Sequence, residues 1–413
     1  MKKIINNVYV FSIISKVIGV IGGIVYTILL SRYLGAELRG ESVIILNLVS
    51  IISVVLGMGV YQAYPRYKKL EGNILEKFLG NITAMFLLYY CISILIVIFI
   101  PININAKIAA LIIPMTIYIK QLNYIVLVEH PKRRNLASIL LNLIDILIVT
   151  IAMLTVKSNY FVMVCFLIIK ELITLLIALQ NLKINIFSIK IRIRELKKYI
   201  RYGFIPMLTL LLMTINYRID VLMLKGQVSI SQIGIYSLGV SLSERIWLIP
   251  DALKDILISR LSKGKNEYEV AKVIRISLCL CIVSIILVII FGKPAINLLF
   301  GKEFSSSYEI TVIMLFGVIG MIFYKIVYSY NVVNGYKTVN LILLGIAAII
   351  NIVGNLILIP IMGIKGAALT SVISYLICGI LFLIYFKEKT NIKLSELIIV
   401  QKDDINLFLK KVQ

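Results

Sequence analysis

The sequence predicts an all-α polytopic membrane protein with about twelve transmembrane helices. Of its 413 residues, 60% are hydrophobic, and the mean hydropathy is +1.00, well outside the composition of soluble proteins. The apolar residues fall into stretches of about 20, the length that crosses some 30 Å of hydrocarbon. Several stretches carry ionisable side chains near their centres, where an ionised group costs at least about 2.5–3.5 kcal/mol unless it faces protein or water. The pattern favours a transporter with a polar interior over a simple membrane anchor.

The spans follow one another along the chain with short connections. The first span continues past Lys16 to Leu30 with no small-residue cleavage site, so we interpret it as a retained helix and not as a signal peptide. No connection exceeds about 25 residues, which leaves no room for a soluble catalytic domain. The predicted spans are 8–31, 42–64, 80–100, 107–128, 137–155, 160–179, 203–225, 231–253, 273–291, 309–331, 339–361 and 364–386.

The basic residues predict the orientation. With the N-terminus inside, 29 of the 43 Lys and Arg residues fall in inner segments, 8 in outer segments and 6 within spans. Because Lys and Arg accumulate in cytoplasmic loops, we expect both termini to lie in the cytoplasm. The membrane that we expect the protein to span is the cell membrane, that is, the inner or cytoplasmic membrane. The net charge of +23 then reflects attraction to the anionic inner leaflet, roughly 1 kcal/mol per nearby cation, and does not indicate nucleic acid.

An internal similarity divides the spans into two six-helix lobes. Gly40 and Arg66 bracket the second span 26 residues apart, and Gly234 and Arg260 bracket the eighth at the same separation. Six spans separate the two pairs, so a repeat here is a parallel one. The predicted domains are an N-terminal lobe (1–179), a basic linker on the cytoplasmic surface (180–202), a C-terminal lobe (203–386) and a cytoplasmic tail (387–413). The tail either lies on the membrane or is disordered.

The first span presents a polar face with two candidate cations. Ser12, Lys16, Gly19, Gly23 and Thr27 recur at helical spacing. This face either packs against another helix, with Lys16 reaching the inner interface, or lines a polar cavity. Arg32 closes the span at its outer end, where it is either an interfacial anchor or a further cavity cation.

The seventh, eighth and tenth spans carry most of the remaining candidates. One interpretation is purely structural, in which Arg218 forms an ion pair with Asp220 or Glu244. Such an ion pair contributes little net stability. Alternatively, these spans form a cationic interior, partly balanced by acids, that accepts an anionic headgroup. Six intramembrane cations against five acids favour phosphate, whose oxygens accept charge-assisted hydrogen bonds. The candidate substrate-binding residues are Lys16, Arg32, Arg218, Asp220, Glu244, Arg245 and Lys325.

Cofactor, metal and catalytic signatures are absent from the sequence. The five cysteines all lie within predicted spans, where they act as small apolar residues, and His130 is the only histidine. No P-loop, nucleophile elbow or metalloprotease helix is present, so we expect no cofactor, no bound metal and no enzyme activity.

Several short motifs resemble one transporter family. Ser31-Arg32-Tyr33-Leu34-Gly35 with Gly40 resembles the first outer loop of the polysaccharide-repeat-unit (lipid-linked oligosaccharide) flippases of the MOP (multidrug/oligosaccharidyl-lipid/polysaccharide) exporter superfamily. Asn216-Tyr217-Arg218-Ile219-Asp220 and Ile233-Gly234-Ile235-Tyr236-Ser237 resemble the family's seventh and eighth spans. Asn351, Asn355, Pro360 and the segment 363–368 resemble its last two spans. The resemblance covers about residues 1–386.

This resemblance implies a MOP/MATE-like fold of two lobes that works by alternating access. It implies a polyprenyl-diphosphate-linked oligosaccharide as substrate, moved from the inner to the outer leaflet for capsule, exopolysaccharide or O-antigen synthesis. Membrane lipids, a polysaccharide polymerase and chain-length proteins are the implied partners. The alternative is an ion-coupled small-molecule antiporter of the same superfamily. A membrane enzyme is disfavoured by the short outer loop 292–308, and a scaffold by the intramembrane charges.

Overall fold

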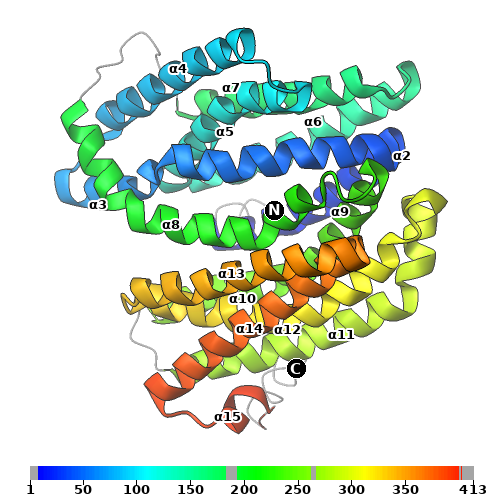
Figure 1. Cartoon of the computed structure of the whole chain (residues 1–413). Coiled ribbons are helices and arrows are strands. Elements are labelled where there is room, and N and C mark those ends of the chain that lie inside the picture. Colours follow the sequence, from blue (N-terminus) through cyan, green and yellow to red (C-terminus); the bar gives the residue numbers. More distant parts are fainter. Residues whose placement is uncertain (1–7, 183–192, 262–266, 400, 402–413) are drawn as a thin grey trace. The chain divides into compact units, whose positions relative to one another are not determined.

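The computed structural model describes residues 8–182, 193–261, 267–399 and 401, and their side chains apart from those of 8–17, 193 and 259. The described residues form helices and no strands, as predicted (Figure 1). The chain separates into two compact units, residues 1–211 and 212–413. Each unit has its own packed interior and is described separately.

The first unit contains the predicted spans one to six and the start of the seventh. Its helices are α2 (Val8–Gly57), α3 (Val60–Glu71), α4 (Leu75–Phe99), α5 (Ile104–Glu129), α6 (Pro131–Thr155), α7 (Tyr160–Leu182) and the first part of α8 (Ile193–Leu224). In this unit α5 is the central helix, because it packs against α2, α3, α4, α6 and α7. Most of its side chains are buried or half-buried and few are exposed, which fits that central position.

The second unit contains the end of α8 and the remaining spans. These are α9 (Ile230–Glu244), the 3-10 segment η2 (Arg245–Trp247), α10 (Leu248–Leu261), α11 (Tyr268–Leu299), η3 (Lys302–Phe304), α12 (Ser307–Val333), α13 (Lys337–Met362), α14 (Ile364–Thr390) and α15 (Leu394–Ile398). Here α12 is central and packs against α9, α10, α11, α13 and α14.

Among the described residues, ten helical segments are by themselves long and apolar enough to cross a membrane. Two features of the helices account for the difference between these ten segments and the twelve predicted spans. The first and second spans are joined in one long helical segment, and the eighth is divided between α9 and α10, both of which are short.

The junction of the first two spans differs from the predicted outer loop. Residues 32–41 are helical except at Gly35, whose φ of 72° and ψ of 178° break the helix. Glycine adopts this backbone conformation without strain, whereas other residues do not. The change of chain direction is therefore made at a single residue. The predicted outer loop is thus reduced to a single break at Gly35, because the residues on both sides of it are compatible with helix.

Two further boundaries differ from the predicted ones. Residues 193–202, expected in the linker, form the first turns of α8, while 183–192 lie outside the described residues. At the other end, α14 continues to Thr390, and the tail adds the short helix α15. Leu397 of α15 is fully buried, and Arg275 of α11 donates a hydrogen bond to the Glu396 carbonyl oxygen. This part of the tail therefore packs on the second unit, and 402–413 lie outside the described residues.

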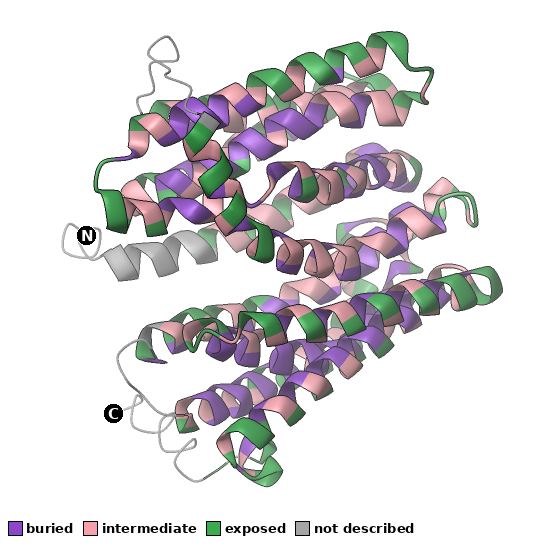
Figure 2. Ribbon diagram, turned by 60° about the vertical axis from the view of Figure 1, so that its left-hand side comes forward, coloured by how far each residue is buried: buried purple, intermediate pink, exposed green. Residues whose placement is uncertain are grey.

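Exposed positions recur along the helices (Figure 2), and many of them are large apolar residues. On α6, exposed leucines and isoleucines recur every three or four residues, which places them on one face of the helix. The face is formed by Leu136, Leu140, Leu143, Leu147, Ile151 and Leu154. In a soluble protein such a stripe would be an aggregation hazard, whereas in a bilayer it contacts lipid.

Glycines permit a close crossing of α12 and α14 in the second unit. Gly320 of α12 and Gly379 of α14 face the partner backbone, and a Cβ on Gly320 would lie 2.1 Å from the Tyr375 carbonyl oxygen. Small residues of this kind let membrane helices approach closely, and the approach gains van der Waals contact.

We predict that Gly320→Ala destabilises the protein by about 1–3 kcal/mol, because the added methyl group forces α12 and α14 apart. The measurement is the thermal unfolding midpoint of purified protein in detergent. Gly345→Ala is the matched control, since its Cβ would meet only Leu212 Cδ1, at 3.8 Å. Equal midpoints for the two variants would contradict the close crossing.

Candidate functional site

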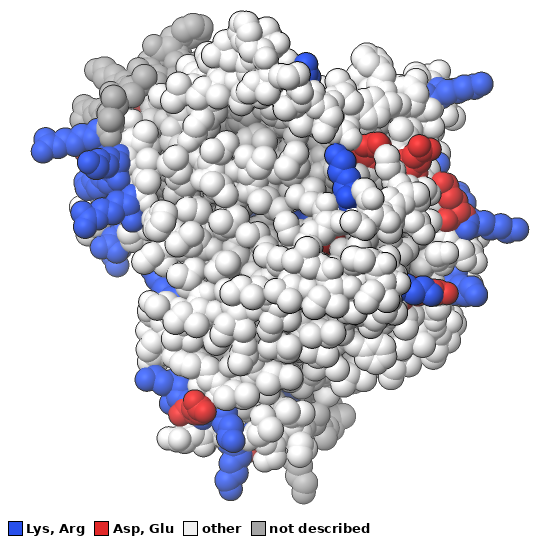
Figure 3. Space-filling view, viewed as in Figure 1, with Lys and Arg blue, Asp and Glu red and all other residues white. Residues whose placement is uncertain are grey.

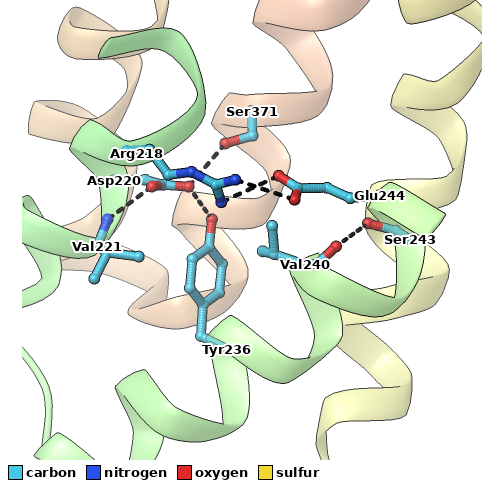
Figure 4. A network of polar contacts seen from close by, with 8 residues as sticks. All are labelled: Arg218, Asp220, Val221, Tyr236, Val240, Ser243, Glu244 and Ser371. Carbon is cyan, nitrogen blue, oxygen red and sulfur yellow. Dashed lines mark hydrogen bonds and ion pairs between the residues drawn. The ribbon is translucent and has the colours of Figure 1, made fainter. Parts of the chain in front are cut away.

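Arg218 and Glu244 form an ion pair in the second unit. Arg218 lies near the end of α8 and Glu244 at the last position of α9. The guanidinium Nη1 and Nη2 atoms donate to the two carboxylate oxygens, each at 3.3 Å (Figure 4). The Arg218 side chain is 35% exposed and that of Glu244 is 17% exposed. Of the two partners that the sequence left open for Arg218, the ion pair is with Glu244.

Asp220 belongs to a separate, fully enclosed network. Its Oδ1 accepts from the backbone N–H of Val221 at 2.7 Å, and its Oδ2 accepts from the hydroxyls of Tyr236 and, at 3.4 Å, Ser371 (Figure 4). The residue is 1% exposed. These donors come from α8, α9 and α14, so Asp220 ties three helices together. Because three donors already occupy the carboxylate, the geometry favours a supporting role over direct contact with a ligand.

Lys325 of α12 is part of a second ion-pair cluster. Its ammonium lies 2.7 Å from Asp251 Oδ2, while Lys254 Nζ lies 2.9 Å from Asp251 Oδ1. On its other side, Lys325 Nζ lies 4.9 Å from the centroid of the Trp247 ring, within the range of a cation–π interaction. Two ammonium groups thus share one carboxylate, and the cluster of Asp251, Lys254 and Lys325 carries a formal charge of +1.

The division of the eighth span positions both ion pairs. The 3-10 segment η2 separates α9 from α10 and holds Arg245 and Trp247. Glu244 immediately precedes this segment and Asp251 follows it, seven residues later and about 10 Å further along the helix axis. The eighth span therefore presents one carboxylate to α8 and another to α12. Arg245 itself is partly buried.

The first unit places its predicted cations less clearly. The Lys16 side chain lies outside the described residues. Arg32 is exposed, whereas Arg39 is 8% exposed and donates to Ser31 Oγ at 2.7 Å. The candidate role at this end was predicted for Arg32, whereas the structure shows Arg39 as a buried cation there.

Two further polar contacts lie between helices of the first unit. Lys170 pairs with Asp145 at 3.2 Å and lies 4.4 Å from the centroid of the Tyr26 ring. Lys120 donates to Ser53 Oγ at 2.8 Å, beside a cavity of about 20 Å³. A volume of this size holds one or two water molecules, so this cavity is too small for a sugar.

A family model described as "Polysaccharide biosynthesis protein" matches residues 29–309, about two thirds of the chain. The chain belongs to this polysaccharide biosynthesis protein family. The matched region includes α8 to α10 and therefore the ion pair of Arg218 with Glu244.

Solved structures show which fold this family member has. The lipid II flippase MurJ, in an inward closed conformation, has a TM-score of 0.73 at 17% identity, covering 98% of this chain and 92% of that one. An inward-facing multidrug resistance MATE family transporter of the MOP superfamily has a TM-score of 0.66 at 14% identity, covering 89% and 94%. A MOP superfamily transporter from Pyrococcus furiosus, described as having a binding pocket of reversed polarity, scores 0.63 at 14% identity, covering 94% and 96%. The MOP fold expected from the short motifs is confirmed.

One curated relative matches a smaller part of the chain. An uncharacterized membrane protein of Methanocaldococcus jannaschii is 36% identical over 129 residues, which are 31% of this chain and 25% of that protein. The match thus spans about a quarter of the relative's length.

Charge is concentrated toward the helix ends on the face seen in Figure 3, where most of the surface over the middle of the helices is uncharged. Among the described residues, no group of three or more His, Cys, Asp or Glu side chains is placed to hold a metal ion.

Sequence reasoning missed the role of Lys254, because it counted this residue with the inner loop after the eighth span. The signal was present as the three-residue spacing from Asp251, which places both side chains on one helical face. The pairing with Lys325 of α12 had no local signal, since it joins residues 74 apart in sequence.

We predict that Tyr236→Phe lowers stability by about 1–3 kcal/mol, because it removes a donor from the buried Asp220 carboxylate. The thermal unfolding midpoint in detergent measures this loss. Tyr375→Phe is the matched control, since the Tyr375 hydroxyl is equally buried and has no hydrogen-bond partner among the described residues. A larger loss in the control would contradict the assigned role of Tyr236.

Proposed function

We propose that this protein is a flippase that moves a polyprenyl-diphosphate-linked oligosaccharide from the inner to the outer leaflet of the cell membrane for cell-surface polysaccharide synthesis. Membership of the polysaccharide biosynthesis protein family and the MOP fold support this proposal. Alternating access between two lobes is the mechanism that we propose for it, with both termini in the cytoplasm. In this account the protein translocates its substrate and carries out no chemistry on it.

The observation that carries the proposal is the pair of cations Arg218 and Lys325 within the membrane-spanning helices of the second unit. Each is held by a carboxylate and neither is fully exposed, so both are already positioned and partly stripped of water. A diphosphate offers several oxygens that accept charge-assisted hydrogen bonds from such groups. We assign Arg218, Arg245 and Lys325 to the headgroup, with Glu244 as the holder of Arg218 and Asp220 as a supporting residue. Lys16 and Arg32 are proposed as substrate-binding residues of the first unit.

The direction of transport fits the charge of this substrate. Moving a negative charge outward is favoured by an inside-negative potential, by about 2.3 kcal/mol per charge for each 100 mV. The membrane potential alone is therefore a sufficient drive in principle, and no ion-binding step is required in the proposal.

The antiporter alternative calls for a carboxylate that is available to bind and release a cation. Three of the intramembrane acids are already paired in the described structure, Asp145 with Lys170, Glu244 with Arg218 and Asp251 with Lys325. A fourth, Asp220, is occupied by three hydrogen-bond donors. Four of the five intramembrane acids, all except Glu171, are thus occupied, which favours a headgroup flippase over an ion-coupled antiporter.

The test of the proposed function is the leaflet distribution of lipid-linked oligosaccharide after the gene is deleted. Intact spheroplasts and inverted membrane vesicles are probed with an impermeant lectin or glycosidase. We expect the oligosaccharide to accumulate on the cytoplasmic leaflet and the wild-type gene to restore the outward pool. An unchanged outward pool would contradict the proposal and favour the antiporter.

We also predict that Arg218→Ala and Lys325→Ala each lower the rate of flipping at least about tenfold, because each removes a charge-assisted contact with the diphosphate. The leaflet assay in the complemented deletion strain measures this effect at matched protein levels. Lys365→Ala is the control, since Lys365 pairs with Glu309 at an exposed position. Normal flipping in both test variants would contradict the proposed cationic site.

A further inference from the structure

The Asp251 cluster has a composition unlike an ordinary ion pair. One carboxylate accepts from two ammonium groups, Lys254 of α10 at 2.9 Å and Lys325 of α12 at 2.7 Å. Asp251 has only two oxygens, and each of them contacts a different lysine. The carboxylate therefore sits where an incoming anion would have to bind in order to contact both ammonium groups at once.

The cluster is accessible on one side and closed on the other. The side chains of Asp251 and Lys254 are 34% and 28% exposed, whereas that of Lys325 is 12% exposed and lies over the Trp247 ring. An anion that arrives from the exposed side therefore contacts Asp251 and Lys254 before Lys325.

Trp247, whose ring face lies against Lys325, also carries an unpaired buried donor. Its side chain is 7% exposed, and the indole N–H is buried without an acceptor in the described structure. A buried donor left unpaired is costly in a native structure and calls for an explanation. A ligand with several acceptor oxygens beside Lys325 would supply more acceptors than the single carboxylate does.

The excess charge of the cluster points to the same ligand class. Two lysines and one aspartate leave the cluster with a formal charge of +1 at the inner end of the eighth span, which favours binding of an anion. The oxygens of a phosphate accept from several donors at once, whereas the Asp251 carboxylate already uses each of its oxygens for one lysine.

We propose that Asp251 is a built-in competitor for the substrate's diphosphate, holding Lys254 and Lys325 in place until a diphosphate displaces it. This inference rests on the proposed flippase function, since it assigns the diphosphate of that substrate to this cluster. The exchange replaces one set of ion pairs by another and involves no covalent step. It keeps the lysines compensated in the empty protein, where unpaired charges within the bilayer would be costly. It also weakens binding enough for the headgroup to be released.

The competitor has a defined position along the transport route. Asp251 lies in α10 about 10 Å beyond Glu244 along the eighth span, so the diphosphate has two ion-pair sites at different depths. With both termini cytoplasmic, the eighth span runs inward, and the Asp251 cluster is the site nearer the inner leaflet. The exchange at Asp251 is then the loading step, and Arg218 with Glu244 is the next site.

The test is the affinity of purified full-length protein for inorganic pyrophosphate, measured by titration calorimetry in detergent at constant ionic strength. Asp251→Asn keeps the shape of the side chain and removes its charge. We expect this variant to bind pyrophosphate about tenfold more tightly than wild type, because a like charge beside the bound anion is lost. Lys254→Ala is expected to bind severalfold more weakly. Glu309→Gln, an exposed carboxylate that pairs with Lys365, is the matched control and is expected to bind like wild type.

Two comparisons separate the possible sources of the phosphate group. Farnesyl diphosphate should compete with pyrophosphate for the site, and phosphatidylglycerol at the same concentration should not. Equal competition by phosphatidylglycerol would overturn the assignment to a diphosphate. Unchanged pyrophosphate affinity in Asp251→Asn, in a variant whose unfolding midpoint matches that of wild type, would overturn the role of Asp251.

The leaflet assay distinguishes failure of this inference from failure of the proposed function. If Asp251→Asn leaves both affinity and flipping unchanged while the wild-type gene restores the outward pool, the competitor role is wrong and the flippase function stands. The expected result is tighter pyrophosphate binding together with slower flipping, since the headgroup leaves the site more slowly.

Discussion

The structure depends on one constraint, that charged groups within a bilayer must be compensated by the protein itself. Hydrocarbon offers no water to solvate an ion, so every intramembrane charge needs a partner or a polar interior. Three cations form ion pairs, Arg218 with Glu244, Lys325 with Asp251 and Lys170 with Asp145. Asp220 is surrounded by hydrogen-bond donors. These contacts join α8 to α9, α10 to α12 and α6 to α7. The same pairs that hold the helices together also keep cations positioned for an anionic headgroup.

The positions of the spans could be predicted from the sequence because hydropathy reports directly on contact with lipid. The exposed stripe of α6 and the enclosed faces of α5 and α12 follow from helical periodicity in the same way. A break between the first two spans was predicted, but its reduction to Gly35 alone and the 3-10 segment Arg245–Trp247 within the eighth span could not be predicted from the sequence. They depend on how neighbouring helices pack, and the local sequence does not encode that packing.

The candidate site was predictable in its residue types and not in its pairings. Sequence analysis identified Arg218, Glu244 and Lys325, but left the partner of Arg218 open between Asp220 and Glu244. The structure separates these two acids into an ion pair and an enclosed hydrogen-bond network, because Asp220 faces Tyr236 and Ser371 from other helices. Lys254 was counted as a loop cation, although it shares the Asp251 carboxylate with Lys325. Contacts between helices distant in sequence decide each of these outcomes.

The most direct test of the central claim is transport by the purified protein alone. The protein is reconstituted into liposomes that contain a labelled polyprenyl-diphosphate oligosaccharide in both leaflets, and an impermeant glycosidase is added outside. Without flipping, digestion stops when the outer leaflet is exhausted. The account predicts that digestion continues to near completion with wild-type protein, and that digestion beyond the outer-leaflet fraction is at least about tenfold slower with Arg218→Ala. Digestion limited to the outer leaflet in liposomes that contain folded wild-type protein would contradict the account.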